Sequence, residues 1–286
     1  MANLKEIRNR ISSIGSTMQI TSAMKMVSAA KLKKAQDAIT AMRPYSSKLT
    51  ELLQNLSATL DSDAGGAYSK QREVSKVLLV VVTSNRGLCG GFNSSVIKET
   101  TQNIAANYQD IDVDLLTIGK KGNDILSKSY PVIDARNDIF DNLTFDFVAE
   151  VAEKIMKLYA DGTYDKIEII YNRFKNAATQ IPQVEQFLPI KPVEGDTNES
   201  ADYIFEPSKE KIVLELIPKS LKTQLYKAVR DSFAAEHGAR MTAMHKATDN
   251  ATELRDELLL TYNKARQAAI TNEILEIVGG AEALKN

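Results

Sequence analysis

Both ends of the chain carry apolar residues at helical spacing over lengths that no small globular core can bury. At the N-terminal end the apolar positions follow one another at intervals of 3, 4, 3 and 4 residues, at Leu4, Ile7, Ile11, Ile14 and Met18. This alternation is typical of a coiled-coil seam. A continuous helix over residues 3–58 would be about 84 Å long, because each residue adds about 1.5 Å of rise.

The C-terminal end shows the same kind of pattern over a longer stretch. Its apolar positions begin at Leu214, Ile217, Leu221 and Leu225 and finish at Ile270, Ile274 and Ile277. We predict a helix over residues 209–284, roughly 114 Å long if it is unbroken. Neither end can bury its apolar stripe alone, so the simplest arrangement winds the two around each other. Since a compact middle section joins them, they should run antiparallel.

Two prolines leave an alternative open. Pro44 should bend or interrupt the first helix near Arg43, because proline lacks the N–H that the helical ladder needs. Pro218 lies near the start of the last helix, where a kink can be tolerated. On the pattern alone, an ordinary helical bundle broken at both prolines competes with the coiled coil.

The middle of the chain alternates between strand and helix patterns. Residues 77–82 form a continuous apolar run, which is typical of a strand buried on both faces. The predicted strands cover residues 76–83, 113–119, 132–133 and 166–173, with a peripheral strand at 180–189, and the predicted helices cover 94–108, 121–128 and 145–159. We therefore expect a mainly parallel sheet with right-handed crossovers. Polar linkers are expected at 61–76 and 191–200.

Composition excludes several classes of protein. Among 286 residues, 36 are Lys or Arg and 37 are Asp or Glu, and a net charge of −1 argues against a dominant nucleic-acid surface. The single cysteine, Cys89, excludes an internal disulfide. No apolar stretch approaches the roughly 18 residues of a membrane span, and the first residues lack a signal core. We expect the chain to work in a reducing cytoplasm or matrix and to reach a membrane only through partners.

A glycine-rich turn follows the first predicted strand and is the feature closest to an enzyme site. A strand, a glycine turn and a helix start are the parts of a phosphate cradle. Gly87, Gly90 and Gly91 nevertheless give G-x-x-G-G, which matches neither the dinucleotide fingerprint nor a Walker A loop. A structural turn is favoured, and a ligand site stays open. Cys89 within the turn could be a nucleophile, but without a nearby histidine a packing thiol is favoured.

The remaining candidate sites are weaker. Asp110, Asp112 and Asp114 begin like a calcium loop, but the required Gly and Glu are absent at the later positions. His237 and His245 lie eight residues apart, too far for simple chelation, and we expect them to be solvated or to face a partner. A basic run near Lys25 and residues 31–34 is expected to be a solvated helix face, because no aromatic residues are interleaved with it. Two very long helices without a convincing active site suggest a mechanical or scaffolding part.

Six blocks of sequence resemble the gamma subunit family of F-type ATP synthases. They are residues 10–14 (RISSI), 20–31 (ITSAMKMVSAAK), 84–93 (SNRGLCGGFN), 236–244 (EHGARMTAM), 247–251 (ATDNA) and 270–283 (ITNEILEIVGGAEA). The blocks occur in the family's order and cover nearly the whole chain, so the resemblance is specific.

The resemblance implies a fold and a mechanical role. It implies an antiparallel coiled coil of the N-terminal helix, residues 1–60, and the C-terminal helix, residues 208–286, with a Rossmann-like α/β domain at 75–190 between them. It implies a non-catalytic rotor that passes torque between a proton-driven c ring and the catalytic ring of alpha and beta subunits, without a cofactor of its own. The implied partners are the alpha, beta and epsilon subunits and the c ring, with no nucleic acid. The implied location is the cytoplasmic face of a bacterial inner membrane.

The resemblance also implies residues that contact partners. Arg266 and Gln267 correspond to positions that meet a catch loop of the beta subunit. Arg240, Thr271 and Glu273 correspond to a hydrogen-bonding network tied to efficient coupling.

Three further residues complete this set. Met24 is expected to pack near that network. Tyr203 and Glu206 correspond to residues at the lower end of the rotor, near the c ring and epsilon. Two other functions remain in competition with the rotor: an α/β enzyme that uses the glycine-rich turn to bind a nucleotide, and a coiled-coil scaffold without a rotary role.

Overall fold

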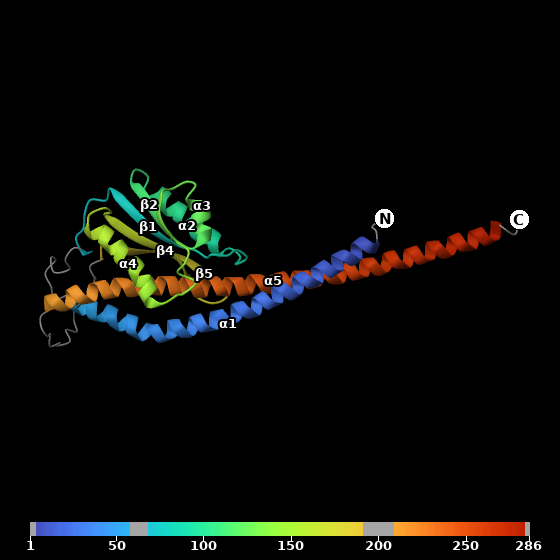
Figure 1. Ribbon diagram of the computed structural model, residues 1–286, viewed down its shortest axis with the longest axis horizontal. Coiled ribbons are helices and arrows are strands. Elements are labelled where there is room, and N and C mark those ends of the chain that lie inside the picture. Colours follow the sequence, from blue (N-terminus) through green and yellow to red (C-terminus); the bar gives the residue numbers. More distant parts are fainter. Residues whose placement is uncertain (1–3, 58–67, 191–208, 284–286) are drawn as a thin grey trace. The chain divides into compact units, whose positions relative to one another are not determined.

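A computed structural model describes residues 4–57, 68–190 and 209–283 (Figure 1). The chain divides into two compact units. The helical unit comprises residues 1–28 and 241–286, and the sheet unit comprises residues 29–240. The predicted linker at 191–200 and the two residues Tyr203 and Glu206 lie outside the described residues, as do residues 61–67 of the linker predicted at 61–76.

A five-stranded sheet forms the centre of the sheet unit. Its strands are β1 (Lys76–Val82), β2 (Asp112–Ile118), β3 (Val132–Arg136), β4 (Lys166–Phe174) and β5 (Gln180–Leu188). They lie in the order β3-β2-β1-β4-β5, with β1 to β4 parallel and β5 antiparallel to β4. The predicted mainly parallel sheet is confirmed, and the peripheral strand is its antiparallel edge.

Helices cover both faces of the sheet, which explains the unbroken apolar run of β1. Val77, Leu79 and Val81 pack with residues of α2 (Phe92–Asn107) and α3 (Lys120–Leu126). The alternate side chains, Leu78, Val80 and Val82, point to the opposite face. Because successive side chains of a strand point to opposite faces, a strand between two helical layers is apolar at every position.

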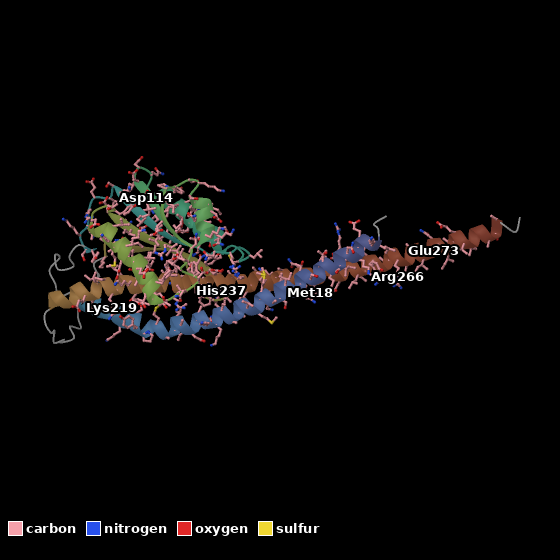
Figure 2. The ribbon with its side chains drawn as sticks, viewed as in Figure 1. Met18, Asp114, Lys219, His237, Arg266 and Glu273 are labelled. Atoms are coloured by element: carbon pink, nitrogen blue, oxygen red, sulfur yellow. The ribbon has the colours of Figure 1, made fainter. Side chains whose placement is uncertain are left out.

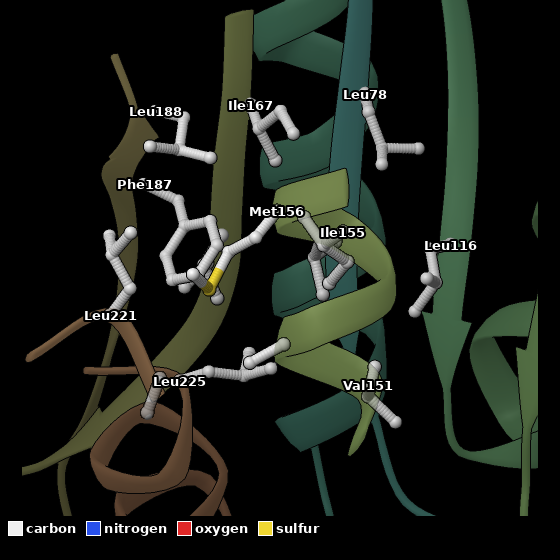
Figure 3. Close-up of a cluster of buried hydrophobic side chains, with 14 of the residues drawn as sticks. Leu78, Leu116, Val151, Ile155, Met156, Ile167, Phe187, Leu188, Leu221 and Leu225 are labelled. Atoms are coloured by element: carbon white, nitrogen blue, oxygen red, sulfur yellow. The ribbon is translucent and has the colours of Figure 1, made fainter. Parts of the chain in front are cut away.

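On that opposite face lie α4 (Phe145–Ala160) and the first part of α5 (Lys209–Ala283). Thr144 caps the start of helix α4, where its side chain accepts a hydrogen bond from the amide of Phe147. The apolar positions of α4 recur every three or four residues. Ile217, Leu221 and Leu225 of α5 join the same core, and Figure 3 shows Leu221 and Leu225 within it. The sequence pattern assigned these three residues to a seam with the N-terminal helix. The structure corrects this, because they pack on α4 and on the sheet.

The N-terminal helix, α1 (Leu4–Ser57), runs through Pro44 without a break. The predicted interruption near Arg43 is therefore wrong, as is the alternative of a bundle broken at both prolines, since α5 also continues through Pro218. The residue whose carbonyl loses its helical donor at Pro44 is Thr40, four positions earlier. Thr40 and Pro44 are both exposed, so water can reach that carbonyl.

The helical unit is an antiparallel pair of helices. Met18 contacts Thr252, Thr21 shares a hydrogen bond with Thr248, at 2.7 Å between their hydroxyl oxygens, and Lys25 reaches His245. Higher numbers on α1 thus meet lower numbers on α5, which confirms the predicted direction. Among the described helices, none combines the length and the hydropathy needed to cross a membrane.

Removing the side chain of Ile155 tests the core on which α5 rests. Ile155 is fully buried between α4 and the sheet, so Ile155→Ala should lower the free energy of unfolding of the sheet unit by about 3 kcal/mol. The exposed Ile125 of α3 is the matched control, and Ile125→Ala should change it by less than about 0.5 kcal/mol. Urea unfolding followed by the near-ultraviolet circular dichroism of the tyrosines measures both. Equal effects of the two substitutions would contradict the assigned core.

Candidate functional site

The glycine-rich turn at residues 84–93 is held by its own polar groups. The carboxamide of Asn93 accepts a hydrogen bond from the amide of Ser84 at 2.9 Å and donates to the Ser84 hydroxyl at 2.8 Å and the Cys89 sulfur at 3.3 Å. Leu88 and Gly90 have positive φ angles of 62° and 59°. A left-handed leucine is rare and persists only where its surroundings determine it. The turn is therefore a rigid element.

Asn85 fixes the turn to the neighbouring strand ends. Its side-chain oxygen accepts from the amide of Lys120, at the start of α3, and its nitrogen donates to the carbonyl of Asn137. These contacts hold the turn at the carboxyl edge of the parallel strands.

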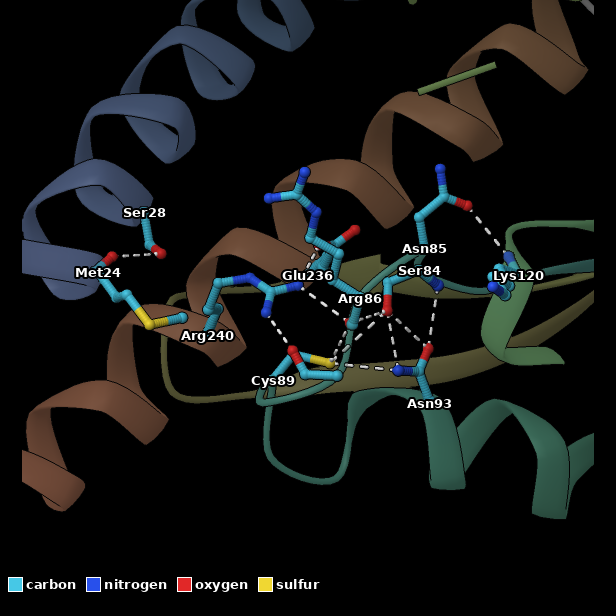
Figure 4. A network of polar contacts seen from close by, with 11 residues as sticks. Met24, Ser28, Ser84, Asn85, Arg86, Cys89, Asn93, Lys120, Glu236 and Arg240 are labelled. Carbon is cyan, nitrogen blue, oxygen red and sulfur yellow. Dashed lines mark hydrogen bonds and ion pairs between the residues drawn. The ribbon is translucent and has the colours of Figure 1, made fainter. Parts of the chain in front are cut away.

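Arg240 of α5 donates hydrogen bonds to the backbone of the turn (Figure 4). Its guanidinium donates to the carbonyls of Gly87 and Arg86 and to the carboxylate of Glu236, one helical turn earlier. Arg240 and Glu236 are both 7% exposed. Burial raises the pKa of the Glu236 carboxyl, while the neighbouring guanidinium opposes that rise. We name Arg240, Glu236 and the turn carbonyls of Arg86 and Gly87 the arginine clasp.

The clasp decides between the two interpretations of the turn. A phosphate cradle presents backbone N–H groups to an anion. Here the turn presents carbonyl oxygens to a cation, and the amide of Ser84 is already bonded to Asn93. The geometry favours a structural turn. Cys89 agrees with the packing interpretation, because its side chain is buried beside Phe92, Ala235 and Ala239 and burial raises the pKa of its thiol.

The two histidines have different environments. His245 is exposed, with its ring 3.3 Å from the carboxylate of Asp249. His237 is buried and lies edge-on against the ring of Phe233, so the expectation that it is solvated is wrong. Among the described residues, neither ring nitrogen of His237 has a hydrogen-bond partner. Burial, with help from the charges of Lys31 and Arg240, lowers its pKa to about 4.

Four of the predicted partner contacts lie near the C-terminal end of α5. Arg266, Gln267, Thr271 and Glu273 are all exposed, and Figure 2 shows Arg266 and Glu273 on this part of the helix. The hydroxyl of Thr271 donates to the carbonyl of Gln267 within the helix. Within the described chain these four residues form no side-chain ion pair, and the charged groups of Arg266 and Glu273 face solvent.

Arg240 and Met24, the other predicted contacts that fall on described residues, are not grouped with these four. Arg240 lies 31 residues before Thr271 on the same helix, about 46 Å of rise, so the two cannot touch within one chain. Arg240 belongs to the sheet unit, where its guanidinium binds the turn. Met24 belongs to the helical unit, and its carbonyl accepts from the Ser28 hydroxyl. Their roles toward a partner stay predictions.

An apolar stripe accompanies the exposed charges. All of residues 266–283 are exposed, and they include five large apolar side chains that are 45–67% exposed: Ile270, Ile274, Leu275, Ile277 and Val278. Contiguous exposed apolar residues on a helix mark an interaction surface. We name residues 266–283 the exposed tip. Sequence reasoning assigned contacts at the tip but missed Glu236, although its spacing of four from Arg240 is the signal for a helical ion pair.

The pH dependence of stability tests the burial of His237. A histidine whose pKa falls from 6.5 to about 4 on folding stays neutral in the folded state while the unfolded chain takes up a proton. Its stabilising contribution is present above pH 6.5 and is lost as the pH falls toward 4, by about 3 kcal/mol in total.

Replacing the imidazole ring of His237 should remove this pH dependence of the unfolding free energy. His237→Phe should flatten the loss of unfolding free energy between pH 7 and pH 4.5, while His245→Gln should leave the wild-type slope. Urea unfolding at several pH values measures both. A His237→Phe slope equal to that of the wild type would contradict a buried neutral imidazole.

The sequence and the fold have counterparts among known proteins. A family model described as ATP synthase matches residues 3–284. The ATP synthase gamma chain of Flavobacterium psychrophilum is 74% identical over 286 residues, covering 100% of both chains. A chain of the central stalk and c-ring structure of the Tetrahymena thermophila mitochondrial ATP synthase is 28% identical, with a TM-score of 0.62, and the match covers 80% of this chain and 99% of that one.

A second structure extends the likeness in fold. A chain of the Euglena gracilis mitochondrial ATP synthase, in its structure of OSCP, F1 and c-ring, has a TM-score of 0.70 and covers 98% of this chain and 94% of that one, at 23% identity. One conclusion follows from the long terminal helices and the five-stranded sheet, together with a family match over nearly the whole length and a relative of 74% identity. The chain belongs to the ATP synthase gamma-chain family, whose members are non-catalytic subunits of that complex.

Proposed function

We propose that this chain is the central rotor of a proton-driven ATP synthase, turning inside a ring of alpha and beta subunits and carrying torque to or from a c ring. The observation that carries the proposal is the exposed tip. Its apolar side chains have no cover within the described chain, while Arg266 and Glu273 stand exposed beside them. A sleeve formed by other subunits would bury this stripe and give the charges partners.

The tip also suits rotation inside a sleeve. Small residues follow one another at its end, at Gly279, Gly280 and Ala281, and apart from the helix's own neighbouring backbone nothing lies within 4 Å of where a Cβ would stand on either glycine. A slim helix end reduces steric obstruction as it turns. Contacts to Arg266 and Glu273 must break in every revolution, so exposed ion pairs of modest energy suit them better than deeply buried ones.

The chain's membrane association follows from the same assignment. We propose that it sits at the cytoplasmic face of a bacterial inner membrane through the c ring and the epsilon subunit. The 74% identity to a bacterial gamma chain supports this location. Tyr203 and Glu206 are proposed to contact those partners, and Met24, Gln267 and Thr271 to face the alpha and beta ring.

Removing two charges at the tip tests the coupling role. In the reconstituted complex, Arg266→Ala with Glu273→Ala should lower ATP-driven proton pumping at least about threefold, because losing even about 0.7 kcal/mol of contact energy changes a rate by that factor. Quenching of a pH-sensitive dye in inverted vesicles measures pumping, and thermal unfolding of the isolated chain measures folding.

The matched control removes one basic and one acidic group far from the tip. Lys98→Ala with Asp110→Ala, both exposed positions of the sheet unit, should leave pumping unchanged. Unchanged pumping in the tip variant, at equal assembly, would refute the coupling role of these two residues.

A further inference from the structure

One short stretch of α5 is buried on every side, unlike the rest of that helix. All of residues 231–240 except Phe233 are buried, and ten residues make almost three helical turns. A helix on a protein surface normally buries one stripe and exposes the other. Immediately after this stretch, residues 241–243 are only half-buried and His245 and Lys246 are exposed.

Different parts of the sheet unit meet different sides of this stretch. The turn at residues 84–93 brings Cys89 and Phe92 against Ala235 and Ala239. Between β4 and β5, the backbone of Ala177 comes so close to Gly238 that a Cβ there would stand 3.2 Å from the Ala177 Cα. These contacts depend on residues with small or absent side chains.

One more neighbour lies against this stretch. Phe140, in the segment after β3, stacks on Phe233 with ring centres 6.0 Å apart. We name residues 231–240 with the turn 84–93, Phe140 and Ala177 the collar.

Apolar enclosure alone does not stop a helix from turning or sliding, because apolar contacts are not directional. The hydrogen bonds of the arginine clasp are directional and can fix the rotation of the helix. A guanidinium is planar with donors in a fixed fork, so its bonds to two carbonyls and one carboxylate are satisfied in one orientation only. Rotation of α5 within the collar would separate this buried cation from its partners, which is costly in a buried site.

We infer that the collar is the joint through which the sheet unit and α5 exchange torque, and that Arg240 is the positioning residue that fixes their relative angle. This inference rests on the proposed rotor function. It assigns Arg240 a role inside its own chain, where the resemblance implies a role in a coupling network. Gly238 supports the joint by allowing the β4–β5 connection to approach the helix.

The test measures torsional stiffness in the assembled complex of this chain with alpha and beta subunits. The ring is fixed to a surface, and a bead is attached to the sheet unit through Lys128→Cys, an exposed position. Cys89 can stay in place because it is 1% exposed. The angular variance of the bead during catalytic pauses reports the compliance of everything between the bead and the ring.

Arg240→Leu should raise this variance at least about twofold, and Arg240→Lys should give an intermediate value, because lysine keeps the charge without the fork. The matched control is Arg255→Leu on the same helix, whose guanidinium lies outside the collar, 3.0 Å from the carboxylate of the adjacent Asp256 and 3.9 Å from the sulfur of Met18. It should leave the variance unchanged. A merely destabilised fold would lower the yield of assembled complex without changing the variance of the complexes that assemble.

Gly238→Ala provides a second, independent variant, since its Cβ pushes the Ala177 backbone away from the helix. It should also raise the variance, and with Arg240→Lys it decides the question should Arg240→Leu fail to assemble. Wild-type variance in the assembled Arg240 and Gly238 variants would overturn the inference, as would an equal rise in Arg255→Leu. Failure of the unsubstituted complex to hydrolyse ATP with rotation would instead refute the proposed function.

Discussion

The burial of the Arg240 guanidinium constrains the whole sheet unit. A cation removed from water needs acceptors, and here two come from the backbone of a turn and one from Glu236 on the same helix. The turn must therefore hold its carbonyls at fixed positions. Asn93 and Asn85 achieve this by bonding the turn to itself and to the neighbouring strand ends. The glycine-rich sequence thus serves a contact between helix and sheet.

Helix α5 passes through several environments, and its sequence changes with them. Ile217, Leu221 and Leu225 pack in the sheet core, where large aliphatic side chains contribute the most burial. Residues 231–240 mix small and polar residues because neighbours approach from every side. Thr248 and Thr252 face α1 in the helical unit, and their hydroxyls also bond to carbonyls of their own helix. The side chains of the exposed tip are not covered by any part of the chain that the structure describes.

Sequence patterns predicted the elements well because the patterns are local. The unbroken apolar run at 77–82 and the spacing of residues 145–159 each identify one element by periodicity, and the observed bounds agree closely. The family, implied by motif resemblance, is confirmed by the comparisons.

Tertiary detail was less predictable. A stripe of leucines fits a coiled-coil partner and a sheet equally well, so the pattern at 214–225 could not show that α5 packs on α4 and the sheet. Pro44 predicts a bend or an interruption of α1, whereas the helix continues through it. The cost of this proline depends on whether water reaches the freed carbonyl, which sequence does not state. The burial of His237 depends on neighbours distant in sequence. The charged residues near His237 in the sequence do not indicate that its side chain is buried.

The proposed rotor role is tested most directly by watching this chain during ATP synthesis. A fluorophore on Lys128→Cys and a second on a stationary peripheral subunit report their separation in single membrane-embedded complexes driven by a proton gradient. We expect energy transfer to cycle through successive levels in a fixed order, at a rate that follows ATP production. Steady ATP synthesis at a constant transfer level would contradict it.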